Sequence, residues 1–160
     1  MATGKPQYNA VIDLPFGRLA ICADDAGLLS VAHVSPATKL KKASHPLAKE
    51  ACRQLKSYVA NPGFRFSVPV ITSGTSFQNK VWRALCRIPG DQTVTYGELA
   101  QKLHTSARAV GNACRCNPVP IIVPCHRVVA RNGNGGYMGK RHGSAIQIKN
   151  WLLRHEASGE

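Results

Sequence analysis

The hydrophobic pattern of the chain changes near residue 72, and this change constrains the fold more than any other feature. Before it, the segments NAVIDL, RLAICA and LLSVAHV are short and apolar, and the turn segments PFG and DDAG separate them, which predicts a hairpin or meander. Ser44 is expected to cap a helix over HPLAKEACRQLKSYVA, and FRFSVPV is expected to be a further strand. Residues 1–72 therefore predict a small α+β lobe.

Helix signals dominate residues 73–160, which we treat as a second domain. Thr75 or Ser76 can cap a helix that ends at PGD, and Ser144 can cap the last helix of the chain. Between them, VPIIVP and RVVA are expected to be strand-like, and RNGNGGYMG is a glycine-rich loop. The expected fold class is α+β, with a mainly helical second domain.

Two short helices of the second domain form a candidate helix-turn-helix. Thr95 and Glu98 make a capping box for the first helix, and Ser106 can cap the second, with only HTS between the helices. The second helix of such a motif normally enters a groove of DNA, and this one carries Arg108 in its first turn and Arg115 near its end. The alternative is a helical hairpin with a solvated basic face.

The charge distribution favours a polyanionic partner. Lys and Arg number 21 against 8 acidic residues, the formal net charge is +13, and no Asp or Glu occurs between Leu99 and His155. Such a stretch is what phosphate binding requires, although a solvated basic surface would look the same. We find no apolar leader and no run long enough to span a membrane. We therefore expect a cytoplasmic, DNA-associated protein.

A cysteine and a histidine stand side by side in the segment IVPCHRVVA. A nearby imidazole or guanidinium stabilises a thiolate, so His126 and Arg127 predict a nucleophilic Cys125 with a lowered pKa. Successive side chains of an extended strand point to opposite faces, so the pair needs a turn after Pro124 or a bridging water to cooperate. A histidine base also needs an orienting partner, and Glu156 is the best-placed carboxylate.

These residues allow two other interpretations. An inert core thiol is the usual state of a buried cysteine. A zinc site would draw on the cysteines and histidines of this region, but the spacing C-x-C is not the usual zinc spacing and a helix would send its two cysteines to different faces. We therefore expect no metal. The residues concerned are Cys114, Cys116, Cys125, His126 and His142.

The stretch NPVPIIVPCHRVV, with ARAVG before it, GYMG after it and WLLRHE near the end, resembles the O6-alkylguanine-DNA alkyltransferases, the methylated-DNA–protein-cysteine methyltransferases. The resemblance covers residues 75–157, and the first 72 residues match only in outline. It implies a small ribonuclease-H-like lobe followed by a winged helix-turn-helix-type catalytic and DNA-binding domain. It also implies a monomer that needs no cofactor and binds double-stranded DNA containing O6-alkylguanine.

The activity that the resemblance implies is DNA repair by direct alkyl transfer. Cys125 is then the acceptor of the alkyl group from O6-alkylguanine, and from O4-alkylthymine, after the damaged nucleotide has been flipped out of the duplex. His126 is the water-linked base, and Glu156 orients it. The thioether that forms is stable, so each chain acts once.

Further site residues follow from the same resemblance. Asn117 corresponds to a hinge asparagine that ties the recognition helix to the active-site strand. Tyr96 helps to rotate the nucleotide, and Arg108 fills the gap left in the base stack. The remaining residues implied in contacts with the base or the DNA are Tyr137 in the pocket wall, the main chain of Val128 and Met138, and Ser106 and Arg115.

Three rival functions are less consistent with these residues. A module that only recognises alkylated bases would lack the acceptor cysteine, whereas Cys125 is present. In a cysteine hydrolase, the Cys and the His are normally far apart in sequence. A regulator acting through the helix-turn-helix alone would leave the Cys-His-Glu set unexplained. The segment GYMGKRHGSAIQ departs from the family, because it is longer and carries Lys140 in place of a second glycine. This departure affects the expected shape of the pocket mouth and therefore which alkyl groups fit.

Overall fold

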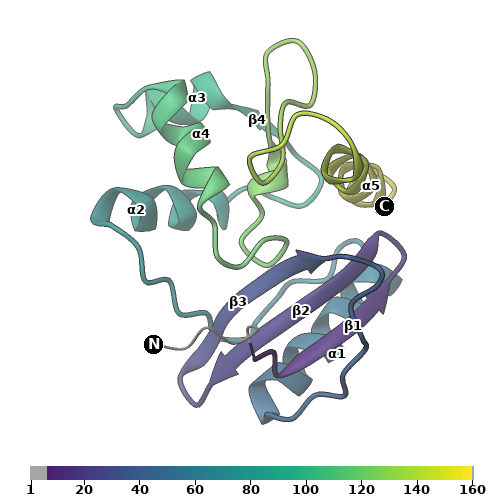
Figure 1. Cartoon of the computed structure of the whole chain (residues 1–160). Helices are drawn as coiled ribbons and strands as arrows, with labels where there is room; N and C mark the ends of the chain where they lie inside the picture. Colours follow the sequence, from purple (N-terminus) through teal and green to yellow (C-terminus); the bar gives the residue numbers. More distant parts are fainter. Residues whose placement is uncertain (1–6, 160) are drawn as a thin grey trace.

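The computed structural model describes residues 7–159 and places them in two groups of elements (Figure 1). The first group is a three-stranded antiparallel sheet in the order β1-β2-β3, with one helix, α1. The strands are β1 (Ala10–Leu14), β2 (Gly17–Asp24) and β3 (Gly27–Val34). This is the expected meander, and it forms because short turns join strands whose apolar side chains can share one buried face.

Helix α1 (Pro46–Ala60) packs on the sheet through a stripe that includes Leu55 and Tyr58, both fully buried. The expected cap at Ser44 is wrong by one residue. The His45 ring accepts from the Leu47 amide at 3.1 Å, and Pro46 follows at the first helical position, where no amide proton is needed.

The expected strand FRFSVPV does not form. Only Val70 makes an isolated bridge, to Leu28 of β3. Pro69 has no amide proton for a ladder, and the side-chain oxygen of Gln54 accepts from the amides of Ser67 and Val68 at 2.9 and 3.2 Å. A side chain of α1 thus takes the backbone groups that a neighbouring strand would have used.

The second group holds α2 (Ser76–Leu85), α3 (Tyr96–Lys102) and α4 (Ala107–Arg115), in the upper half of Figure 1. Thr75 caps α2 with a complete capping box, and Ser106 accepts from the Ala109 amide at the start of α4, as predicted. Thr95 also caps α3, but the expected capping box is incomplete. The Glu98 carboxylate accepts from the Thr95 hydroxyl at 3.1 Å and not from the Thr95 amide.

The region between α4 and the last helix is irregular. VPIIVP is not a strand, because Ile121 takes a left-handed backbone conformation with φ 75°. RVVA contributes only β5 (Val128–Val129), which pairs in parallel with β4 (Val94–Thr95). Helix α5 (Ser144–Ala157) follows Gly143, whose φ is 79°, so Ser144 is the first helical residue and not the expected cap.

The two groups share one hydrophobic core. Phe16, in the β1–β2 turn, packs on Trp151 of α5 with ring centroids 4.9 Å apart, and Trp151 stacks on His155 at 4.6 Å. The edge strand β3 also touches the second group, since the Val31 amide donates to the Pro118 carbonyl at 2.9 Å. The structure is thus a mixed α/β arrangement. No helix among residues 7–159 is both long and apolar enough to cross a bilayer.

Candidate active site around Cys125

Cys125 begins a short 3-10 helix, Cys125–Arg127, directly after Pro124. The Cys125 amide donates to the Val123 carbonyl at 2.9 Å, and the Arg127 amide donates to the Pro124 carbonyl at 3.1 Å. This is a turn after Pro124, one of the two arrangements that the sequence allowed. Because the backbone is not extended here, Cys125 and His126 are not forced onto opposite faces.

Asn117 holds the segment that leads to Cys125. Its side-chain amide donates to the Val123 carbonyl at 2.7 Å, and its side-chain oxygen accepts from the Val119 amide at 3.0 Å. The residue is buried and lies just after the end of α4. Asn117 therefore ties the end of α4 to the segment before the thiol through two hydrogen bonds.

The Glu156 carboxylate is the most heavily bonded group of the site. Its oxygens accept from His126 Nε2 at 2.8 Å, from Tyr58 Oη at 2.7 Å, and from Arg127 Nε and Nη2 at 2.9 and 3.0 Å. Burial raises the pKa of Glu156, but the hydrogen bonds from His126 and Arg127 outweigh it and lower the pKa to about 2. The carboxylate is therefore ionised at neutral pH.

This ionised carboxylate fixes the tautomer of His126. A carboxylate can only accept, so His126 Nε2 must carry a proton and donate it. Burial lowers the pKa of His126 despite Glu156, so the ring is neutral at neutral pH and Nδ1 holds a free lone pair. Nδ1 is buried and has no hydrogen-bond partner among the described residues. An oriented, neutral imidazole with one free nitrogen is a general base.

The expected lowering of the Cys125 pKa is wrong for this structure. Cys125 is only 4% exposed, and its burial raises the pKa of the thiol, although Asn117 and the Lys149 ammonium act in the opposite direction. Arg127 does not serve the thiol either, because its guanidinium binds Glu156 and donates to the Ile88 carbonyl at 2.7 Å. The resting state is therefore a protonated thiol that needs a base.

Lys149 is a functional candidate that sequence reasoning missed. Its ammonium is fully buried and donates to the carbonyls of Val128 and Gly136 at 2.7 and 2.8 Å. Burial lowers its pKa to about 8, against the opposing effects of Cys125 and Cys114. A signal existed, because Lys149 and Glu156 are seven residues apart and share the buried face of α5 with Leu152.

Tyr58 was missed for a different reason. The sequence places it on the apolar stripe of α1, but nothing in the pattern shows that its hydroxyl reaches a carboxylate 98 residues later. Burial and the neighbouring Glu156 charge raise the pKa of Tyr58 far above its ordinary value, so it remains a neutral donor.

The glycine-rich loop brings Tyr137 and Met138 to the thiol. Tyr137 and Lys140 exchange backbone hydrogen bonds of 2.9 and 3.0 Å around a tight turn, in which Met138 and Gly139 both have positive φ. The Met138 sulfur lies 3.9 Å from Cys125 Sγ. Met138 thus lies beside the thiol, whereas the Val128 carbonyl, which was expected to bind the base, accepts from Lys149.

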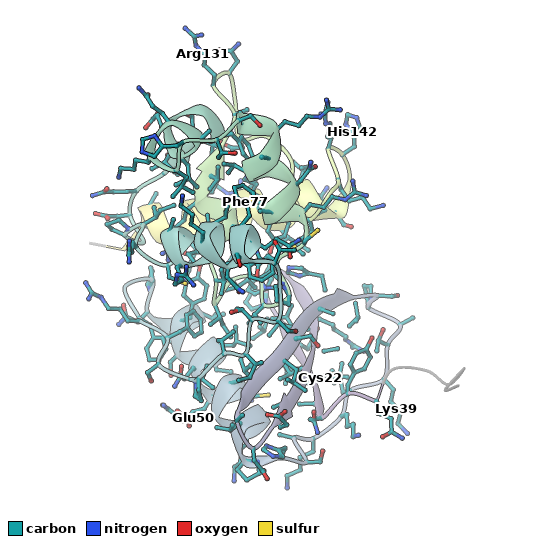
Figure 2. All side chains as sticks on the ribbon, turned by 90° about the vertical axis from the view of Figure 1, so that its left-hand side faces the viewer. Cys22, Lys39, Glu50, Phe77, Arg131 and His142 are labelled. Carbon is teal, nitrogen blue, oxygen red and sulfur yellow. The ribbon has the colours of Figure 1, made fainter. Side chains whose placement is uncertain are left out.

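The residues expected to meet DNA lie on α3 and α4. Tyr96, at the start of α3, is half-buried, and burial, then Cys114 and Cys125, raise its pKa to about 12. Arg108 is exposed in the first turn of α4, and Arg115 is exposed in its last turn, close to Gly139. Figure 2 shows two further basic side chains, Arg131 and His142, on outer loops of the same group.

A cavity among the described residues lies beside this site and not at the thiol. It measures about 820 Å³ and extends between the segment 62–72, α2 and Pro124, reaching Arg127 and Glu156 but not Cys125. The candidate site is therefore located by the chemistry at Cys125 and not by this cavity. The described residues contain no cluster of three or more His, Cys, Asp or Glu side chains that could bind a metal, and Cys114 is buried whereas Cys116 is exposed.

Comparison with known proteins identifies the chain. Residues 76–158 match the family model described as 6-O-methylguanine DNA methyltransferase, DNA binding domain. That match covers more than half of the chain, including all of the candidate active site except Tyr58. The chain belongs to the O6-methylguanine DNA methyltransferase family.

Relatives in this family match the chain over most of its length. A methylated-DNA–protein-cysteine methyltransferase of Methanosarcina acetivorans is 38% identical over 159 residues, which cover 94% of this chain and 99% of the relative. The same enzyme from Shigella flexneri is 47% identical over 107 residues, 64% of this chain and 60% of the relative.

Solved structures of the family agree. A variant of the Mycobacterium tuberculosis O6-methylguanine methyltransferase has a TM-score of 0.79 at 34% identity, covering 94% of this chain and 92% of that one. The M. tuberculosis protein solved in complex with DNA has a TM-score of 0.76 at 35% identity, covering 92% of each chain.

Proposed function

We propose that this chain repairs alkylated DNA by transferring the alkyl group of O6-alkylguanine, and of O4-alkylthymine, to its own Cys125. The observation that carries the proposal is that Cys125 and the next residue, His126, are both buried, with His126 Nε2 bound to Glu156 and Nδ1 without a partner among the described residues. The names of the relatives support it, because they are methylated-DNA–protein-cysteine methyltransferases. The M. tuberculosis structure in complex with DNA supports a DNA partner.

The chemistry is a displacement at carbon. His126 accepts the thiol proton at Nδ1, directly or through a water molecule, and Cys125 Sγ forms a bond to the alkyl carbon as the bond from that carbon to guanine O6 breaks. Guanine leaves as a neutral base when it gains a proton, which balances the proton lost by the thiol. His126 can serve as this base because Glu156 holds Nε2 in the protonated form.

Access to the buried thiol requires base flipping, because guanine O6 is hidden inside a duplex. We propose that α3 and α4 act as a winged helix-turn-helix that binds double-stranded DNA in the minor groove. Tyr96 would rotate the nucleotide, and Arg108 would occupy the gap in the stack. Ser106 and Arg115 would bind the backbone, and Tyr137 and the main chain of Val128 and Met138 would bind the base.

The division of labour within the chain is part of the proposal. Residues 1–72 would form a ribonuclease-H-like lobe, and residues 73–160 the catalytic and DNA-binding domain. We propose a monomer acting in the cytoplasm on DNA, without a cofactor.

Intact mass spectrometry tests the proposal. An equimolar duplex containing O6-methylguanine should raise the mass of the chain by one methyl group in place of a hydrogen, about 14 Da, on Cys125. Cys125→Ser should bind the duplex without gaining mass. Several turnovers per chain, or methylation of Cys114 or Cys116 instead, would contradict direct transfer to Cys125.

A further inference from the structure

A histidine of the sheet reaches across to the pocket wall. His33 lies near the end of β3, and its Nε2 is 2.7 Å from the hydroxyl of Tyr137, 104 residues later in the chain. The two rings meet edge to face, with centroids 5.3 Å apart and an interplanar angle of 66°. Tyr137 immediately precedes Met138, whose sulfur lies against Cys125. A single hydrogen bond therefore connects the N-terminal sheet to the wall of the candidate pocket.

The charge states of both partners make this a bond between neutral groups. Burial, followed by the nearby His126, lowers the pKa of His33 to about 4. Burial is also the main cause that raises the pKa of Tyr137 well above its ordinary value. At neutral pH, an uncharged imidazole therefore faces an uncharged phenol. Tyr137 is only 3% exposed, and His33 is the hydrogen-bond partner of its hydroxyl among the described residues.

The fold alone does not call for a histidine at this position. Nδ1 of His33 is buried and has no hydrogen-bond partner among residues 7–159. A buried ring nitrogen without a partner destabilises a protein, whereas an apolar side chain of similar size carries no such penalty. The hydrogen bond to Tyr137 is thus what His33 provides and a leucine would not. This bond holds a side chain of the candidate pocket wall.

We propose that His33 is a positioning residue for alkyl transfer, which holds the Tyr137 side chain and, through the turn that Tyr137 forms with Lys140, the sulfur of Met138 against Cys125. The N-terminal sheet then sets the shape of a pocket built from the second group of elements. This inference rests on the proposed function, because it concerns the same thiol. It assigns a role to a residue outside the segment that matches the family model.

Single-turnover transfer from the free base O6-benzylguanine tests the inference, because this substrate needs no base flipping. His33→Leu removes the bond and keeps an apolar volume, whereas His33→Gln keeps an amide that can bond to a hydroxyl. We expect His33→Leu to lower the transfer rate at saturating substrate about three- to tenfold, the range that one neutral hydrogen bond supports. His33→Gln should recover most of the rate.

Non-additivity provides the second readout. Tyr137→Phe removes the same bond from the other side, so it should slow transfer to a similar extent, and the double variant should be no slower than either single variant. Val31→Ala is the matched control, because Val31 lies on the same face of β3 and is buried, but its aliphatic side chain cannot hydrogen-bond to the Tyr137 hydroxyl. It should lower the melting temperature and leave the rate at saturation unchanged.

The outcomes separate the two proposals. A wild-type rate in His33→Leu, equal slowing by Val31→Ala, or additive losses in the double variant would overturn the positioning role while leaving transfer to Cys125 intact. Absence of transfer by the unsubstituted chain would overturn the proposed function, and this inference with it.

Discussion

Glu156 joins folding and chemistry in a single residue. It accepts four hydrogen bonds from three side chains, Tyr58 on α1 and His126 and Arg127 beside the thiol. A buried carboxylate is tolerated only when its lone pairs are satisfied, and removing a partner of such a group leaves a buried charge uncompensated. The carboxylate that orients the candidate base is therefore also one whose hydrogen bonds the stability of the fold depends on.

Glu156→Gln should slow alkyl transfer at neutral pH by about tenfold or more, because general-base catalysis is typically worth about two to four orders of magnitude. A glutamine no longer forces the proton onto His126 Nε2, so Nδ1 is less often free. Duplex affinity, measured by fluorescence anisotropy, should change little.

Tyr58→Phe is the matched control for that prediction. It removes one donor from the same carboxylate but leaves the bond between His126 and Glu156 intact. It should lower the unfolding free energy by about 1–2 kcal/mol and leave the transfer rate near that of the parent. If both variants slow transfer equally, Glu156 acts through stability alone.

At the scale of elements, the expected caps were correct for α2, α3 and α4 but wrong for α1 and α5, where His45 and Gly143 take the place of Ser44 and Ser144. The caps at Thr75, Thr95 and Ser106 predicted three helices, because a cap is decided within four residues. FRFSVPV and VPIIVP look like strands, but neither forms one. In the first, the Gln54 side chain accepts from a backbone amide, and in the second, Ile121 takes a left-handed backbone conformation.

The residues of the candidate site were likewise predictable only in part. Cys125, His126 and Glu156 could be found in the sequence because the motif and the scarcity of carboxylates indicate them, and the structure brings His126 and Glu156 into contact. Tyr58 and His33 could not, because their partners lie 98 and 104 residues away and no periodicity encodes such a pairing. The raised pKa of Cys125 could not be predicted from the sequence either, since it depends on how deeply the folded chain buries the thiol.

Helix α4 supports a prediction about Arg108, which is exposed in its first turn. If Arg108 occupies the gap in the base stack, Arg108→Ala should slow repair within a duplex far more than transfer from free O6-benzylguanine. A phosphate contact would instead weaken binding to every duplex and reduce the salt slope by about one unit.

Arg115→Ala is the companion variant, because that residue is exposed at the other end of α4. It should show the phosphate pattern. Equal slowing of Arg108→Ala on the duplex and on the free base would show that Arg108 serves the pocket or the fold.

For the whole molecule, the buried titrating groups predict a loss of stability in acid. The pKa of His33 falls from 6.5 to about 4 in the folded chain, so between these values the unfolded chain binds a proton that the folded chain does not. Glu156 behaves likewise between 4.5 and about 2. The unfolding free energy should therefore fall as the pH drops from 6.5 to 2, by at most about 1.4 kcal/mol per pH unit for each group.

Urea unfolding between pH 7 and pH 3 measures this dependence. His33→Leu should flatten the slope between pH 6.5 and 4 without abolishing it, because burial also lowers the pKa of His126. Val31→Ala should lower stability equally at each pH and keep the parent slope. An unchanged slope in His33→Leu would contradict the assignment of this proton to His33.

The packing of Trp151 against Phe16 and His155 gives the protein an optical reporter of its own. The chain has two tryptophans, and the other, Trp82, is buried within the second group, where its indole donates to the Ala113 carbonyl. Trp151, on α5, contacts Phe16 of the first group. In a Trp82→Phe background, the emission wavelength and quenching of the single remaining indole would follow whether the two halves stay docked while DNA binds, without any added dye.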